Sequence, residues 1–103
     1  MNTYDPIYAV VRKIPKGSVA SYAQVGRSLG LRNGARLVGW AMRRLEPGSD
    51  VPWWRVINSK RRISIVNPRV TKTDQQRLLE DEGIEIVERD GWLTVVGEKW
   101  AEI

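Results

Sequence analysis

The 103-residue chain contains neither cysteine nor histidine. Disulfide bonds are therefore impossible, and so are the zinc sites that depend on thiolate or imidazole ligands. A thiolate nucleophile and a histidine general base are excluded as well. Any catalysis would have to rest on a carboxylate, lysine, serine, threonine or tyrosine.

Long apolar runs are also missing. No stretch reaches the roughly 18 apolar residues that a membrane-spanning helix needs. The first residues, Met1–Asp5, lack the basic and then apolar pattern of a signal peptide, so we expect a cytoplasmic, nucleoid-associated protein, or a nuclear one in a cell with a nucleus. Hydrophobic residues make up 42% of the chain, which predicts a packed core. The length predicts one domain over residues 1–103.

Acidic residues are scarce in the first two thirds of the chain. Residues 1–69 contain 13 Lys or Arg against 3 acids, a net charge of +10, whereas residues 70–103 contain 4 against 9, a net charge of −5. A basic region of this size is suited to neutralising phosphates, although a solvated surface would look similar. Arg accounts for 12 of the 17 basic residues, and its planar guanidinium suits phosphates and bases better than an ammonium. The charge pattern therefore favours nucleic acid as a partner.

Two helices are predicted near the N-terminus. An Asp-Pro pair and apolar residues at helical spacing indicate a helix over 6–14. A second helix is expected to start at Ser21, because Gln24 completes a capping box with it. Gly30 is expected to end that helix in the left-handed conformation.

A third helix is predicted over 34–45, with Asn33 as its N-cap. Together with the second helix it would form a helix-turn-helix over about 21–45. Arg36 and Arg43 are seven residues apart and so share one face, which could be a DNA-facing surface or an ordinary charged exterior. The residues of this region that we expect to contact DNA are Asn33, Ala35, Arg36, Gly39 and Arg43.

The composition of that helix suggests how it would approach DNA. Its small residues Ala35 and Gly39 would allow close approach of the helix backbone. Its first turn offers few hydrogen-bonding groups for reading major-groove base edges apart from Arg36. Small residues with a single arginine are suited to the minor groove and to a side chain inserted into the base stack.

Two hairpins are predicted in the second half. Strands at 54–57 and 63–65 would form a wing around the turn 58–62. Strands at 84–87 and 93–96 would pair across an Asp-Gly turn.

Between these hairpins, a capping box at Thr73–Gln76 predicts a helix that ends at Gly83 and buries Leu78 and Leu79. Residues 46–50 are expected to form a loop. The predicted fold class is α+β, mainly helical, in the form of a winged helix-turn-helix DNA-binding domain.

Three sequence blocks occur in an order typical of one protein family. They are Ile-Pro-Lys-Gly-Ser-Val-Ala-Ser-Tyr at 14–22, Ala-Arg-Leu-Val-Gly at 35–39 and Pro-Trp-Trp-Arg-Val-Ile at 52–57. The chain resembles, over roughly residues 7–86, the DNA-binding domain of the O6-alkylguanine-DNA alkyltransferases. It is specifically similar to their non-catalytic relatives, the alkyltransferase-like proteins.

The third block departs from the enzymes at two positions. Trp53 occupies the place of the cysteine that accepts the alkyl group, and Trp54 that of the histidine that activates it. An indole N–H is only a donor and is not nucleophilic. The resemblance therefore implies a binding protein with no catalytic residues, rather than an enzyme. The relatives often retain the histidine, so Trp54 is a further departure.

The resemblance implies roles for individual residues. Tyr22 would press on the phosphate next to a lesion and help to rotate the nucleotide out, and Arg36 would take the place of the flipped base. Trp53 would line a lesion pocket built from the motif 52–59, and Arg69 in the following loop, 65–69, would offer a cation to the flipped guanine. The predicted lesion-pocket residues are Tyr22, Pro52, Trp53, Trp54, Arg55, Val56 and Arg69.

The function implied is recognition of O6-alkylguanine in double-stranded DNA by nucleotide flipping. The protein would act as a monomer, without cofactor or metal, and would pass the lesion to nucleotide excision repair. Two alternative functions would depend on other residues of the chain. A winged-helix transcription regulator would use Arg61 and Arg62 in its wing and bind a palindrome as a dimer. A glycosylase would use a catalytic Asp or Lys, and Asp50 is the only acid near the 52–57 motif.

Overall fold

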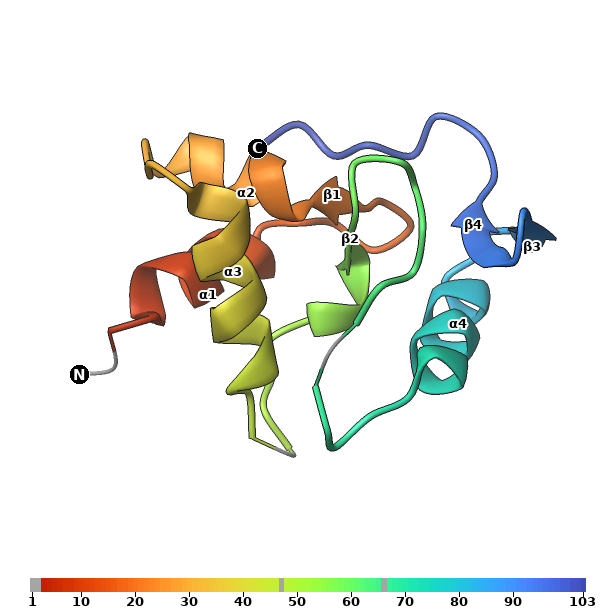
Figure 1. Ribbon diagram of the computed structural model, residues 1–103, viewed down its shortest axis with the longest axis horizontal. Helices are drawn as coiled ribbons and strands as arrows, with labels where there is room; N and C mark the ends of the chain where they lie inside the picture. The colour runs from red at the N-terminus through yellow and green to blue at the C-terminus, as the bar shows by residue number, and fades with distance from the viewer. Residues whose placement is uncertain (1–2, 47, 66) are drawn as a thin grey trace.

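The computed structural model describes residues 3–46, 48–65 and 67–103; Pro47 of the predicted 46–50 loop and Val66 of the loop 65–69 lie outside them. Helices dominate this part of the chain, and two small sheets accompany them (Figure 1). The α+β, mainly helical fold class is confirmed. The elements in chain order are α1 (Asp5–Arg12), β1 (Ala20–Ser21), α2 (Tyr22–Ser28), α3 (Gly34–Arg43), the 3₁₀ helix η1 (Trp53–Arg55), β2 (Val56–Ile57), α4 (Lys72–Asp81), β3 (Ile86–Arg89) and β4 (Trp92–Val95).

Helix α1 packs one apolar face against the rest of the N-terminal half. It begins one residue earlier than predicted and ends at Arg12, while Ile14 beyond its end is still fully buried. Tyr8 presents its ring to the core and donates a hydrogen bond from Oη to the carbonyl of Ala41 at 2.7 Å. This bond ties α1 to α3.

Helices α2 and α3 form the predicted helix-turn-helix. The capping box is confirmed, since Ser21 Oγ accepts from the Gln24 N–H at 2.9 Å and Gln24 Oε1 accepts from the Ser21 N–H at 3.4 Å. Gly30 has the expected positive φ, +65°. Asn33 is the N-cap of α3 as predicted, but it adopts the left-handed conformation and its side chain makes no capping bond. Helix α3 ends at Arg43, two residues earlier than expected.

The two helices of this motif cross at a pair of glycines. A Cβ placed on Gly26 would lie 2.5 Å from the Cα of Gly34, closer than real side chains come to backbone. Both residues are buried. Because neither position can hold a side chain, the crossing sets the distance between α2 and α3.

The predicted wing hairpin is wrong. Strand β2 pairs in parallel with β1, with Ala20 opposite Val56 and Ser21 opposite Ile57. Segment 63–65 forms no strand with β2; instead the Ile63 N–H donates to the carbonyl of Leu93 at 2.9 Å. Only the turn between them exists, closed by a bond from the Asn58 N–H to the Arg62 carbonyl at 3.1 Å. An alternating apolar pattern predicts extended backbone but does not determine its partner.

Helix α4 starts at a different capping box from the one predicted. Thr71 Oγ1 accepts from the Asp74 N–H at 3.0 Å, and the Asp74 carboxylate accepts from the Thr71 N–H at 2.8 Å. A threonine followed three residues later by an acceptor occurs twice here, as Thr71 with Asp74 and as Thr73 with Gln76. The pair with the charged acceptor forms the cap, because a carboxylate is stabilised at the positive N-terminal end of a helix. The helix buries Leu79, whereas Leu78 is only half-buried.

The predicted C-terminal hairpin is present as the antiparallel strands β3 and β4, shifted by one or two residues from the expected 84–87 and 93–96. Ile86 lies opposite Val95, and Arg89 lies opposite Trp92. Its turn residues Asp90 and Gly91 both have positive φ, 53° and 81°, as a type I′ turn requires. The chain beyond it crosses back over the molecule (Figure 1) and Ala101 accepts a hydrogen bond from Gln24.

Two apolar clusters make up the core. The first lies among α1, α2 and α3, and the second lies among β2, α4 and the C-terminal hairpin. Strand β2 joins them, because Val56 belongs to the first and Ile57 to the second. The turn Trp53–Arg55 therefore lies at their junction. None of the helices in the described ranges is long and apolar enough for a membrane span.

Candidate nucleic-acid interface

The exposed side of α3 borders a groove against α2. Its volume is about 360 Å³, and it brings together three of the predicted DNA contacts, Asn33, Ala35 and Arg36. Arg27 lies in the same groove. Gly39 has open space where a Cβ would stand, so its backbone can be approached from outside. A cationic groove beside a helix N-terminus is suited to a phosphate backbone.

A second, larger groove of about 760 Å³ lies at the C-terminal end of α3. Arg43, the remaining predicted DNA contact on α3, lines it together with Arg69 and the half-exposed Trp40. Glu46 also lines it, and its carboxylate lies 3.7 Å from the Arg69 guanidinium. The other residues that line this groove are Tyr4, Arg44 and Pro68.

Next to that groove is a smaller cavity of about 170 Å³. It brings Trp53 and Arg69, both predicted lesion-pocket residues, into one wall, and it shares Glu46 and Arg69 with the larger groove. The complete lining consists of Leu45, Glu46, Gly48, Ser49, Trp53, Asn67, Arg69 and Val70. Tyr22, Pro52, Trp54, Arg55 and Val56 do not line it.

Asn67 holds this cavity in shape, and the sequence reasoning missed it. The residue is buried, and its Nδ2 donates to the carbonyls of Met42 at 2.9 Å and Leu45 at 3.3 Å. Its Oδ1 accepts from the Arg69 N–H at 2.8 Å. The loop with Arg69 is thereby fixed to the end of α3. An asparagine between the largely apolar segment 63–66 and Pro68 was the available signal.

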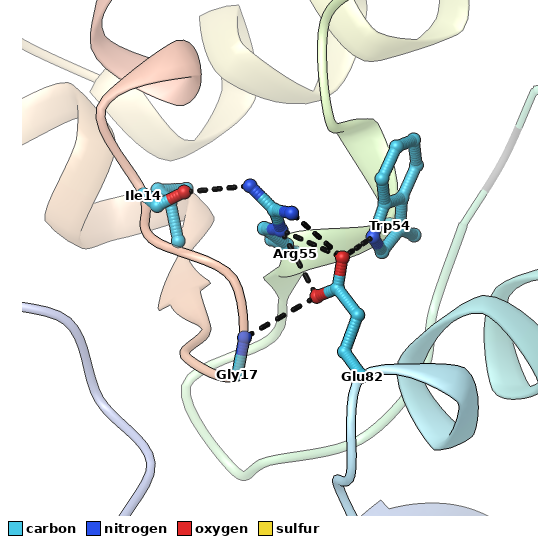
Figure 2. Close-up of polar contacts among 5 residues, drawn as sticks. All are labelled: Ile14, Gly17, Trp54, Arg55 and Glu82. Carbon is cyan, nitrogen blue, oxygen red and sulfur yellow. Dashed lines mark hydrogen bonds and ion pairs between the residues drawn. The ribbon is translucent and has the colours of Figure 1, made fainter.

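The two tryptophans of the 52–57 block point in different directions. Their rings meet edge to face, with centroids 5.9 Å apart and planes at 89°. Trp53 packs on the first core cluster and faces the cavity, whereas Trp54 packs on the second. Trp54 Nε1 donates to Glu82 Oε2 at 3.0 Å (Figure 2). Pro52 and Val56, on either side, are buried and serve as supports for this turn.

Glu82 is the centre of a polar network that the sequence reasoning also missed. Its carboxylate accepts from Arg55 Nε at 3.0 Å and from Arg55 Nη2 at 2.6 Å, while Arg55 Nη1 donates to the carbonyl of Ile14 at 2.9 Å (Figure 2). Burial opposes ionisation of Glu82, but the hydrogen bonds from Arg55, Trp54 and the Gly17 N–H, with the Arg55 charge, outweigh it and lower the pKa of Glu82. Arg55 is thus engaged in this network in the free protein.

Tyr22 is the first residue of α2. Its Oη is buried and makes no hydrogen bond of normal geometry with the described residues, although the Ser64 hydroxyl lies nearby. Burial raises the pKa of Tyr22, and Ser64 offsets only part of that effect. The hydroxyl is therefore enclosed in the free protein and would have to become accessible to reach a phosphate.

No cluster of three or more carboxylates placed to hold a metal ion occurs among residues 3–46, 48–65 and 67–103. Besides the ion-paired carboxylates Glu46 and Glu82, the polar groups that the fold brings together are arginines, amides and indoles. This set is suited to contacting phosphates and stacking on bases.

Comparisons with known proteins agree on one family. The model of the 6-O-methylguanine DNA methyltransferase DNA-binding domain matches residues 2–84. Over 83 residues, which are 81% of this chain and 77% of the relative, the sequence is 42% identical to alkyltransferase-like protein 1 of Schizosaccharomyces pombe. It is 43% identical over 82 residues to the DNA base-flipping protein of Vibrio parahaemolyticus, which is 80% of each chain. The crystal structure of the S. pombe protein with damaged DNA containing O6-carboxymethylguanine matches over 100% of both chains, with a TM-score of 0.88 and 34% identity.

Proposed function

The chain belongs to the family of the 6-O-methylguanine DNA methyltransferase DNA-binding domain, among its alkyltransferase-like members, and we propose that it recognises O6-alkylguanine in duplex DNA by nucleotide flipping. It is not an alkyltransferase, because none of its 103 residues is a cysteine that could accept the alkyl group. The resemblance of its helix-turn-helix fold to the DNA-bound S. pombe structure supports a duplex as the ligand.

The observation that carries the proposal is the placement of Trp53. The residue that stands where the enzymes have their acceptor cysteine forms a wall of the cavity that also contains Arg69. An indole there can pack on an alkyl group and on a purine, and base–aromatic stacking contributes about 1–3 kcal/mol. Flipping a nucleotide costs a few kcal/mol, and less where alkylation has weakened the base pair. Binding can therefore favour the lesion without any reaction.

The grooves along α3 supply the remaining contacts. In this proposal Arg36 enters the duplex where the flipped base has left, because a planar guanidinium can stack and hydrogen-bond there. Arg43 contacts phosphates. Asn33 and Ala35, at the end where α3 begins, and Gly39, in the middle of the helix, face the DNA backbone. Tyr22 contacts the phosphate next to the lesion once its hydroxyl is uncovered. On binding, Arg69 leaves its ion pair with Glu46 and contacts the flipped guanine instead.

The proposal also covers what happens in the cell after the lesion is bound. A protein that holds a lesion without repairing it has to pass it on, and we propose nucleotide excision repair as the recipient. We propose further that residues 1–103 act as one domain and as a monomer. The site of action is the DNA-containing compartment, which is the nucleoid in a bacterial cytoplasm or the nucleus.

The test is a titration of two duplexes that differ only in one O6-methylguanine, at physiological salt. The wild type is expected to bind the damaged duplex more tightly, and Trp53→Ala is expected to lose roughly 5- to 150-fold in affinity for it, the equivalent of one stacked base. Arg36→Ala is expected to reduce the same preference. Lys99→Gln, an exposed charge change outside both grooves, serves as the control. Equal affinity of the wild type for the two duplexes contradicts the proposal.

A further inference from the structure

Helix α3 contains a cation–π pair between Arg36 and Trp40. The guanidinium carbon of Arg36 lies 5.4 Å from the centroid of the Trp40 ring. The two residues are one turn apart, and helical side chains lean toward the N-terminus, so the indole is carried back over the arginine. Trp40 is 47% exposed, the largest exposed fraction of the large apolar side chains that the structure describes.

The indole is the one side-chain partner that Arg36 has in the described part of the chain. No hydrogen bond or ion pair of its guanidinium is formed there, whereas Arg12, Arg55, Arg61, Arg69 and Arg77 all contact carboxylates. Arg27, a second cation, lines the same groove as Arg36. The stack with Trp40 therefore restricts a long side chain that would otherwise be mobile, and it does so without occupying a hydrogen-bond donor.

We propose that Trp40 is a positioning residue, whose exposed indole orders the guanidinium of Arg36 beside α3 before DNA is bound. The proposal rests on the proposed role of Arg36 in the duplex. Ordering a side chain in advance reduces the entropy that binding has to remove. Since an indole has no conventional hydrogen-bond acceptor, the N–H groups of Arg36 stay available to bases and phosphates. The benefit of Trp40 should accordingly be present only when Arg36 is present.

A double-mutant cycle tests this dependence. The proteins are the wild type, Trp40→Gln, Arg36→Ala and the double variant, and the probes are the O6-methylguanine duplex and its undamaged counterpart. Trp40→Gln is expected to weaken binding of the damaged duplex about two- to fivefold, as for an exposed cation–π contact, and to have no further effect in the Arg36→Ala background. Trp40→Tyr, which keeps an aromatic face, is expected to retain most of the affinity. Thermal melting should be similar for the wild type and the Trp40 variants, because the indole is half-exposed.

A second measurement reads the contact in the free protein. In the wild type, the Arg36 side-chain proton resonances are expected to show an upfield ring-current shift that Trp40→Gln abolishes. The absence of that shift overturns the proposal, and so does an equal loss of affinity from Trp40→Gln with and without Arg36. A lack of effect of Arg36→Ala overturns it as well. If the wild type binds both duplexes equally, the proposed function fails, while the shift and the coupling measured on undamaged duplex still decide the role of Trp40.

Discussion

Replacing Glu82 with alanine is expected to destabilise the protein more than any change on its surface. The carboxylate accepts hydrogen bonds from Trp54 Nε1 and from the Arg55 guanidinium, and a longer one, 3.4 Å, from the Gly17 N–H. These partners lie in the turn η1 and in the segment after α1, so one side chain of the segment after α4 links three parts of the chain (Figure 2). The alanine variant leaves all of these donors without their acceptor.

The burial of the pair sets the magnitude. The Glu82 side chain is 9% exposed and that of Arg55 is 15% exposed, so solvent cannot replace the lost partner easily. Removing one member of a buried ion pair costs about 3–5 kcal/mol, because the other charge stays buried and unpaired. At about 4 °C per kcal/mol for a domain of this size, the melting temperature should fall by roughly 12–20 °C. Glu82→Gln keeps an acceptor for Trp54 and should fall in between.

The assay is thermal and urea unfolding followed by circular dichroism. Glu85→Ala is the matched control, because Glu85 is exposed and lies only three residues away. Its effect should stay within about 0.5 kcal/mol, as for most surface substitutions. If Glu82→Ala unfolds at the same temperature as Glu85→Ala, the network around Arg55 and Trp54 does not support the fold as described.

Three further predictions concern pH, the helix crossing and Tyr22. The pKa of Glu82 is lowered in the folded state. The stabilisation that its carboxylate provides should therefore be complete above the unfolded pKa of about 4.3, and it should be lost as pH falls through the folded pKa. Urea midpoints measured between pH 7 and 3 should accordingly fall more for the wild type than for Glu82→Gln. Gly26→Ala would place a Cβ 2.5 Å from the Gly34 Cα, so its free energy of unfolding in urea should fall by about 1–3 kcal/mol. Gly39→Ala, whose Cβ would stand in open space, should be neutral or slightly stabilising. Tyr22→Phe removes a buried hydroxyl that makes no hydrogen bond of normal geometry with the described residues, so unfolding should show unchanged or higher stability while affinity for damaged duplex falls. A clear loss of stability would show that the hydroxyl is satisfied in the native state.

Features encoded in a few adjacent residues could be predicted from the sequence. The Ser21–Gln24 capping box and the Asp90–Gly91 turn are decided by neighbours in the chain, and the structure has both. The helix-turn-helix followed from helical periodicity and Gly30. The match of three spaced blocks identified the family. Of the seven residues predicted to form the lesion pocket, Trp53 and Arg69 line one cavity and the other five do not.

Features that depend on distant partners could not be predicted. The pairing of Ala20–Ser21 with Val56–Ile57 joins segments more than 30 residues apart, and two-residue strands show no pattern that would specify it. In the sequence, no pattern distinguishes Glu82 from the other acidic residues of the C-terminal third. Only the fold places it against Arg55 and Trp54. The position of Glu82 also explains why Trp54 turns away from the cavity that Trp53 lines, because the Trp54 indole N–H donates to this carboxylate.

The central claim is that an indole at position 53 turns an alkyl-acceptor site into a site that only binds. The most direct measurement is incubation of the protein with an oligonucleotide duplex containing one O6-methylguanine, followed by mass spectrometry of both protein and DNA. The account predicts that the damaged duplex is retained in preference to an undamaged one, and that the masses of protein and DNA are unchanged. A protein that gains the methyl group, DNA that loses it, or equal retention of the two duplexes would contradict the account.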